Sequence, residues 1–253
     1  ISSFKNKKIN INLKDLYGEN PTKCSKSENS LIFGNTIEDV DQNVLEKAEC
    51  FFINANQVGN HASILNVIKF LKKNFNKKPI AIIENSQAVT AYSLSKVKDE
   101  FLDLGCEYIL IGDLENISVE VYKNLNNEDY LKNINGIITK NFCNDKINFI
   151  ENLDTLSYPA WEEFPLENYW MLGYSHGPLS SEKYLPILSS RGCPYPCNFC
   201  VVPKTNERRW RSRSPKNVVD ELEYFKKKFN VKEFHFEDLN STVNDNRTKE
   251  LCN

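Results

Sequence analysis

Short apolar runs alternate with segments of helical periodicity through the first half of this chain of 253 residues. The runs that we interpret as strands are 48–55, 79–83 and 108–111, and the segments that we interpret as helices are 61–74, 90–104 and 117–125. Such alternation is typical of a parallel sheet wrapped by helices. We therefore predict an α/β fold whose first domain, residues 1–145, is Rossmann-like, of the flavodoxin type.

A second unit is predicted after a linker over residues 146–180, which is rich in proline and aromatic residues. Before this unit, residues 136–139 and 146–150 suggest a short hairpin. Residues 181–253 then open with a strand at 184–188 and continue to a second strand at 231–236. We interpret this arrangement as the beginning of a (β/α) barrel.

The helix between these two strands is predicted to start at Ser214 and Pro215, since serine is a good N-cap and proline suits the first helical position. Its apolar residues indicate the face that packs on the core, and these are Val218, Val219, Leu222 and Phe225.

Composition excludes several classes of protein. The net charge of −2 gives no general attraction to nucleic acid or to anionic membranes, and no apolar run is long enough to span a bilayer. The eight cysteines are too scattered for a disulfide framework, so we expect a reducing, cytoplasmic location. The chain starts at Ile1, has Met171 as its only methionine and ends within a predicted helix, so we expect a fragment that is inactive alone.

Three cysteines, Cys193, Cys197 and Cys200, follow Gly192 with the spacing C-x3-C-x2-C. Three thiolates on one loop can hold three irons of a cubane cluster and leave the fourth iron open to another ligand. The alternative is a zinc site completed by Cys252, Cys143 or a histidine, although zinc sites usually have two separated cysteine pairs.

The segment 207–213 is basic and contains Trp210. Basic and aromatic side chains together suit stacking on nucleotide bases, so a zinc-stapled RNA-binding module is an alternative function. The favoured interpretation is a positively charged surface beside the cysteine loop, because seven residues are too few to form a binding groove. Nucleic acid is therefore not an expected partner.

The cysteine run resembles the signature of the radical S-adenosylmethionine (SAM) enzymes. The resemblance implies that Cys193, Cys197 and Cys200 bind a [4Fe–4S] cluster, which cleaves SAM to a 5′-deoxyadenosyl radical. It also implies that Phe199 lies near the adenine of SAM, and that Glu237 or Asp238 faces its amino group. Such enzymes need an electron donor such as flavodoxin or ferredoxin.

Within this family the chain is similar to the cobalamin-binding class, through Tyr108–Glu115 and Leu153–Trp161. That class uses methyl transfer, rearrangement or cyclisation chemistry, here on an unknown small or lipid-like substrate. The resemblance implies a cobalamin site at the strand ends, formed by Ser86, Gln87, Gly112 and Asp113. The chain departs from the class at Leu114, where a glycine is usual, and it has no Asp-x-His-x-x-Gly motif.

A second alternative is the methylthiotransferase subgroup, whose first domain holds another cluster on three cysteines. Here these would be Cys24, Cys50 and Cys106, but Cys50 and Cys106 precede predicted strands and suit buried positions better. Three further residues are interpreted as structural rather than catalytic, namely His61, Cys143 and His176.

Overall fold

The computed structural model describes residues 1–27, 30–173 and 177–253, which form two compact units. Unit 1 comprises Ile1–Asn35, Glu151–Cys193 and Arg209–Asn253, and unit 2 comprises Thr36–Ile150 and Pro194–Arg208. The long segment of unit 2 thus ends at Ile150, close to residue 145, where we predicted the end of the first domain. Residues 1–35, by contrast, group with unit 1.

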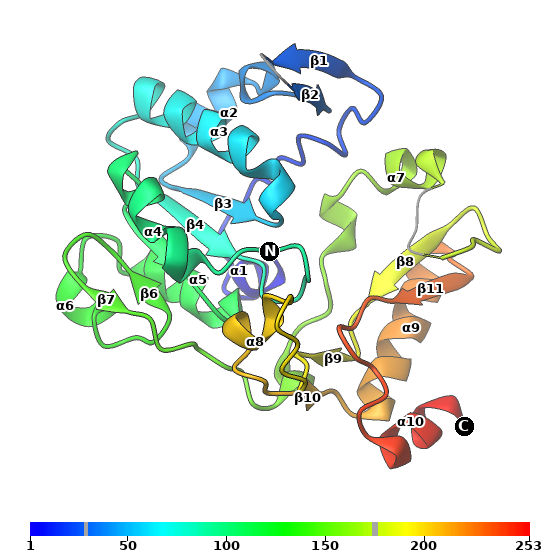
Figure 1. The fold of residues 1–253 in the computed structure, drawn as a ribbon. Helices are drawn as coiled ribbons and strands as arrows, with labels where there is room; N and C mark the ends of the chain where they lie inside the picture. Colours follow the sequence, from blue (N-terminus) through cyan, green and yellow to red (C-terminus); the bar gives the residue numbers. More distant parts are fainter. Residues whose placement is uncertain (28–29, 174–176) are drawn as a thin grey trace. The chain divides into compact units, whose positions relative to one another are not determined.

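Unit 2 is built on a five-stranded sheet in the order β3-β4-β5-β6-β7 (Figure 1). Its strands are β3 (Phe51–Ala55), β4 (Ile80–Glu84), β5 (Tyr108–Leu110), β6 (Ile137–Ile138) and β7 (Cys143–Asn144). The first three strands are parallel, and the last two pair antiparallel. The predicted strands and their parallel arrangement are therefore confirmed.

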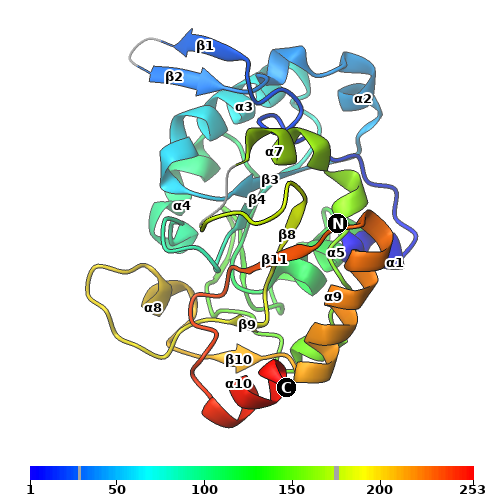
Figure 2. The same ribbon diagram turned by 90° about the vertical axis from the view of Figure 1, so that its right-hand side faces the viewer.

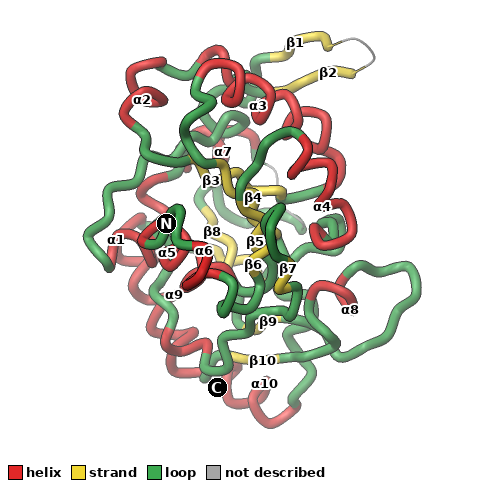
Figure 3. The backbone as a smooth tube through the Cα atoms, turned by 90° about the vertical axis from the view of Figure 1, so that its left-hand side faces the viewer, coloured by secondary structure: helices red, strands yellow, loops and turns green. Residues whose placement is uncertain are grey.

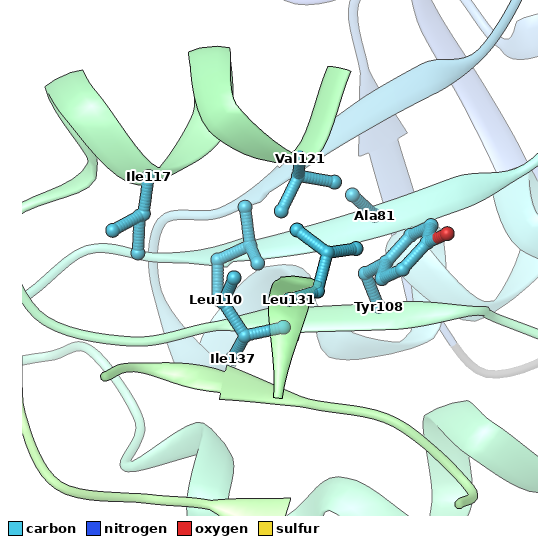
Figure 4. Close-up of a cluster of buried hydrophobic side chains, with 7 residues drawn as sticks. All are labelled: Ala81, Tyr108, Leu110, Ile117, Val121, Leu131 and Ile137. Atoms are coloured by element: carbon cyan, nitrogen blue, oxygen red, sulfur yellow. The ribbon is translucent and has the colours of Figure 1, made fainter. Parts of the chain in front are cut away.

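Helices cover both faces of this sheet, with α3 and α4 on one side and α5 and α6 on the other (Figure 3). The helices of unit 2 are α2 (Gln42–Lys47), α3 (His61–Asn74), α4 (Leu94–Asp103), α5 (Leu114–Lys123), α6 (Glu128–Leu131) and α8 (Val202–Thr205). Figure 4 shows Ile117 and Val121 of α5 above the sheet residues Leu110 and Ile137, in a cluster shielded from water. Burial on both faces explains why these strands are continuous apolar runs.

The predicted hairpin is wrong in its second strand. β6 pairs with Cys143–Asn144 of β7, and not with residues 146–150. The later segment runs beside the end of β5 instead, where the Asn148 carbonyl accepts a hydrogen bond from the Asp113 N–H at 2.8 Å. This backbone contact leaves no trace in the side-chain pattern.

Unit 1 contains the predicted βαβ element, in which β8 (Tyr184–Ile187) and β11 (Glu233–Phe236) are parallel and α9 (Pro215–Phe229) connects them (Figure 2). Ser214 caps α9 as predicted, because its side chain accepts a hydrogen bond from the Asn217 N–H. A short antiparallel ladder joins β9 (Ser190–Arg191) to β10 (Arg211–Ser212).

The buried face of α9 differs in part from the prediction. Val218 and Phe225 are buried, but Val219 is exposed and Glu221 is buried in its place. Phe225 packs with Leu185 of β8 and Val231. Aromatic residues of the predicted linker cover this cluster, namely Tyr158, Trp161 and Trp170.

The remaining elements of unit 1 are α1 (Ser2–Asn6), β1 (Cys24–Ser27), β2 (Ser30–Phe33), α7 (Leu166–Leu172) and α10 (Asp245–Cys252). The antiparallel β1–β2 pair was not predicted. No helix within the described ranges is both long and apolar enough to cross a membrane.

Candidate functional site

The three motif cysteines follow β9 on an irregular loop. Gly192 turns the chain directly after the strand with φ of +80°, as its position in the motif predicts. Cys193 and Cys200 are half-buried and Cys197 is exposed, and all three are free thiols. A turn joins the last two, because the Cys200 N–H donates to the Cys197 carbonyl at 3.2 Å.

The donor set of this loop suits an iron–sulfur cluster, since it offers three unpaired thiols that solvent can reach. Within the part of the chain that the structure describes, no three His, Cys, Asp or Glu side chains converge closely enough to hold a metal ion. The assignment of Cys193, Cys197 and Cys200 as cluster ligands thus rests on the chemistry of the thiols and on their spacing.

The aromatic residue before the last cysteine is open to solvent. Phe199 is 94% exposed, the highest value among the exposed large hydrophobic side chains of the described residues. An exposed phenyl ring costs free energy unless a partner covers it. Its position therefore leaves the ring available to stack on a flat ligand such as adenine.

The two carboxylates after β11 differ in their surroundings. Asp238 accepts hydrogen bonds from the Ser189 N–H at 3.1 Å, from the Ser189 hydroxyl at 3.0 Å and from the Ser190 hydroxyl. Asp238 thus ties the end of β11 to the start of β9. The Glu237 N–H donates to the Ile187 carbonyl at 2.9 Å and so extends the β8–β11 pairing. The Asp238 carboxylate thus joins two segments of unit 1 through Ser189 and Ser190.

Two of the residues predicted to hold cobalamin, Ser86 and Gln87, bind another part of unit 2. The Ser86 carbonyl accepts a hydrogen bond from the Asn206 side-chain amide, and the Gln87 Nε2 donates to the Asn206 Oδ1 at 3.0 Å. Ser86 is buried. Asn206 was not singled out from the sequence, because nothing in its local pattern reports a partner so distant in the chain.

The other two predicted cobalamin residues are also used inside the unit. Gly112 bridges to Asn148 with φ of +91°. Asp113 is buried, and its Oδ2 accepts a hydrogen bond from the Ile150 N–H at 2.7 Å. Each of the four residues is therefore already bonded within unit 2, and its role as a cobalamin contact stays a prediction.

A buried carboxylate that the sequence analysis missed lies at the same sheet edge. Glu84 ends β4, and its oxygens accept hydrogen bonds from the Leu94 N–H at 2.9 Å and from the Gly112 N–H at 3.4 Å. Burial raises the pKa of this carboxyl to about 7, although the two hydrogen bonds act in the opposite direction. Glu84 also lines a cavity of about 170 Å³ with residues that include Ser93, Lys96 and Lys204.

The methylthiotransferase alternative is disfavoured by the state of its cysteines. Burial raises the pKa of Cys50 to about 11 and that of Cys106 to about 12, so neither thiol readily becomes the thiolate that a cluster needs. Cys24 is exposed. Cys143 and Cys252, the thiols considered for zinc, are both exposed.

The arginines of the basic segment have partners within the protein, which disfavours a free RNA-binding patch. Arg208 donates to the Pro194 carbonyl, and Arg209 pairs with Glu151 at 2.7 Å. Arg213 pairs with the buried Glu221 at 2.6 Å. Arg211 is itself buried.

His61 begins α3 and has a structural setting, as predicted. Its Nε2 lies 3.1 Å from Glu100, and its ring packs edge-on against Tyr92 and Phe101. His176 lies outside the described residues.

The cysteine loop and the elements that follow it define the class of the protein. Residues 187–252 match the family model of the radical SAM superfamily, so this part of the chain is similar to a radical SAM domain. The matched segment contains the three motif cysteines, α9, β11 and the two carboxylates after it. The family recognised from the sequence is confirmed.

Relatives with described functions are enzymes, in agreement with the prediction. Cytidylyl-2-hydroxyethylphosphonate methyltransferase of Streptomyces wedmorensis is 30% identical over 100 residues, which are 39% of this chain and 19% of that protein. Anaerobic magnesium-protoporphyrin IX monomethyl ester cyclase of Synechocystis sp. is 28% identical over 153 residues, 58% of this chain and 28% of that protein. The chain therefore spans 19 to 28% of the length of these relatives.

Among solved structures, the fold is similar to the radical SAM methyltransferase TsrM from Kitasatospora setae, solved with cobalamin and a [4Fe–4S] cluster bound. The TM-score is 0.60 at 15% identity, over 83% of this chain and 42% of that one. The likeness confirms the predicted fold class, a Rossmann-like domain with a radical SAM domain.

Proposed function

We propose that the protein is a radical SAM enzyme in which Cys193, Cys197 and Cys200 hold a [4Fe–4S] cluster and the open iron binds SAM. The observation that carries the proposal is the C-x3-C-x2-C loop inside the segment that matches the family. When bound, the cluster would supply one electron for the reductive cleavage of SAM to a 5′-deoxyadenosyl radical.

The residues around the loop have distinct roles in this proposal. The exposed ring of Phe199 stacks on the adenine. Glu237 binds the amino group of SAM, because a carboxylate pairs well with an ammonium. Asp238 positions the turn between β8 and β9 through Ser189 and Ser190, so it acts on the site without taking the ligand.

For the whole protein we propose a methyl transfer or a ring-forming reaction on a small or lipid-like molecule, because the matched relatives include a methyltransferase and a cyclase. An electron donor such as flavodoxin or ferredoxin and a cytoplasmic setting belong to the same proposal. Since Ser86, Gln87, Gly112 and Asp113 are engaged within unit 2, no step is assigned to cobalamin at these residues.

The test is anaerobic reconstitution of the chain with iron and sulfide, followed by metal analysis and electron paramagnetic resonance. We expect about four irons per chain, and a spectrum that changes on addition of SAM. Cys193→Ala, Cys197→Ala and Cys200→Ala should each abolish this signal, whereas Cys143→Ala and Cys252→Ala should not. Anaerobically purified protein that contains zinc alone, lost in Cys143→Ala or Cys252→Ala, would instead establish the zinc alternative.

A further inference from the structure

The part of the cysteine loop that carries Cys197 and Cys200 folds with unit 2, to which Pro194–Arg208 belongs. Its polar attachment includes the buried side-chain amide of Asn206. Asn206 is 1% exposed, and every polar atom of its side chain has a partner. The Nδ2 donates to the Ser86 carbonyl and to the Thr205 hydroxyl, and the Oδ1 accepts from the Gln87 Nε2.

This contact continues into the sheet edge of unit 2. The second hydrogen of the Gln87 amide goes to the Ser86 hydroxyl at 2.9 Å. That hydroxyl lies 3.5 Å from the Gly112 carbonyl, at the end of β5. Because the Asn206 amide is fully bonded and buried, removing it would take one hydrogen-bond partner from the Ser86 carbonyl and one from the Gln87 amide.

A short rigid path leads from Asn206 back to the cysteines. The Asn206 N–H donates to the Val202 carbonyl at 2.9 Å, and the Thr205 N–H donates to the Val201 carbonyl at 3.2 Å. These bonds belong to α8, a single helical turn that begins at Val202, two residues after Cys200. The turn from Cys200 to Cys197 then extends the ordered path to the second thiol.

The backbone after Asn206 supports the same conclusion. Glu207 and Arg208 both have left-handed conformations, with φ of 48° and 58°. Such residues are strained and persist where surrounding contacts hold them. Asn206 supplies these contacts on one side, and the bond from the Arg208 Nε to the Pro194 carbonyl closes the loop on the other.

We propose that Asn206 is a positioning residue, which docks the cysteine loop on Ser86 and Gln87 and thereby sets the placement of Cys197 and Cys200. The inference rests on the proposed function for its effect on the cluster, but the docking itself does not. Residues that resemblance assigns to a cofactor thus serve to hold the loop that carries the cluster ligands.

The test compares Asn206→Leu, which keeps the size but removes the amide, with Gln87→Leu, which removes one of its bonds. Asn144→Leu is the matched control, because Asn144 also donates its amide to a backbone carbonyl of unit 2, that of Ile134. Hydrogen exchange of the metal-free chain should accelerate about tenfold over residues 201–206 in Asn206→Leu, and less in Gln87→Leu. Alkylation of Cys200 should accelerate in parallel, and the control should match the unsubstituted chain.

After reconstitution, Asn206→Leu should hold less iron per chain and give a broadened paramagnetic spectrum. Unchanged exchange and alkylation would overturn the docking. Faster exchange with unchanged iron content and spectrum would make Asn206 a purely structural residue and overturn the positioning. If Asn206→Leu does not fold, the same criteria apply to Gln87→Leu. An unsubstituted chain that assembles no cluster would refute the proposed function, while exchange and alkylation still decide the docking.

Discussion

The carbonyl oxygen of Asn148 lies 2.5 Å from the point where a Cβ atom on Gly112 would stand. Gly112 has φ of +91°, and the neighbouring Asp113 N–H donates to the same carbonyl at 2.8 Å. Resemblance assigned Gly112 to a turn that approaches a cofactor. In this structure the glycine is required by the chain itself, because the backbone at Asn148 passes too close for any side chain at position 112.

Gly112→Ala should therefore destabilise the protein by about 2 to 4 kcal/mol, from the left-handed backbone and the clash with Asn148 together. Chemical denaturation measures the change. Gly59→Ala is the control, since no atom lies within 4 Å of its added Cβ, and its effect should stay within about 0.5 kcal/mol. Equal stabilities of the two variants would show that Gly112 and Asn148 are not in close contact.

Glu84 should make stability depend on pH, because burial raises the pKa of its carboxyl from 4.5 to about 7. Below pH 4.5 both the folded and unfolded states hold the proton, and the full contribution to stability is present. Between 4.5 and 7 the unfolded state releases the proton first, so stability falls as pH rises, by about 3 kcal/mol in total. Above pH 7 the carboxyl is ionised in both states, so this contribution is absent and Glu84 no longer makes the free energy of unfolding depend on pH.

Glu84→Gln should remove that slope, because the amide has no proton to release in this range. The measurement is the free energy of unfolding in urea at intervals from pH 4.5 to 8, for the variant and the unsubstituted chain. Glu46→Gln, at an exposed carboxyl, should keep the slope. A slope that survives in Glu84→Gln would assign it to other groups.

How far sequence predicts this molecule depends on whether a feature is local. The helix predicted over 61–74 is found at those residues, because its apolar period and its packing face agree. The face of α9 was predicted less well. Val219 continues the apolar pattern but is exposed, whereas Glu221 is buried because Arg213 supplies a countercharge.

The residues of the candidate site also divide into those that a local sequence pattern reveals and those that it does not. The three cysteines are recognisable because their spacing on one loop is itself the signal. The Asn206–Ser86 contact joins positions 120 apart in the chain and depends on loop conformation. Glu84 is likewise invisible in sequence, since its burial arises where the end of β4 meets backbone N–H groups from two other segments.

The Arg213–Glu221 pair predicts strong non-additivity between its two members. Their side chains are 11% and 3% exposed, and the charged atoms are 2.6 Å apart. Glu221→Leu should cost about 3 to 5 kcal/mol, because it leaves a buried guanidinium without its countercharge. The double variant Arg213→Met/Glu221→Leu should cost less than the sum of the single changes.

Urea denaturation of the two single variants and the double variant measures this coupling. The exposed pair Lys216–Asp220 lies on the same helix, and Lys216→Met should leave stability unchanged. Additive effects in the buried pair would mean that Arg213 and Glu221 do not interact as the structure has them.

Asp238 and Glu237 should respond in different ways to loss of charge. Asp238→Asn should lower stability by about 1 to 3 kcal/mol, because its amide cannot accept all the bonds from Ser189 and Ser190. Glu237→Gln should weaken SAM binding to the cluster-loaded chain, because it removes the charge that pairs with the amino group. Thermal unfolding measures the change in stability, and equilibrium dialysis measures SAM binding. If Glu237→Gln lowers stability and Asp238→Asn weakens SAM binding instead, the roles proposed for the two residues are exchanged.

Phe199→Ala should separate folding from binding, because the ring is 94% exposed and contributes little to the fold. Stability should change by less than about 0.5 kcal/mol. Stacking of an aromatic ring on a base contributes about 1 to 3 kcal/mol, so SAM binding should weaken about 5- to 150-fold. Tyr195→Ala removes another exposed aromatic ring from the same loop and should leave affinity unchanged. Anaerobic calorimetry on the cluster-loaded chain compares the two variants, and equal affinities would show that Phe199 does not stack on the adenine.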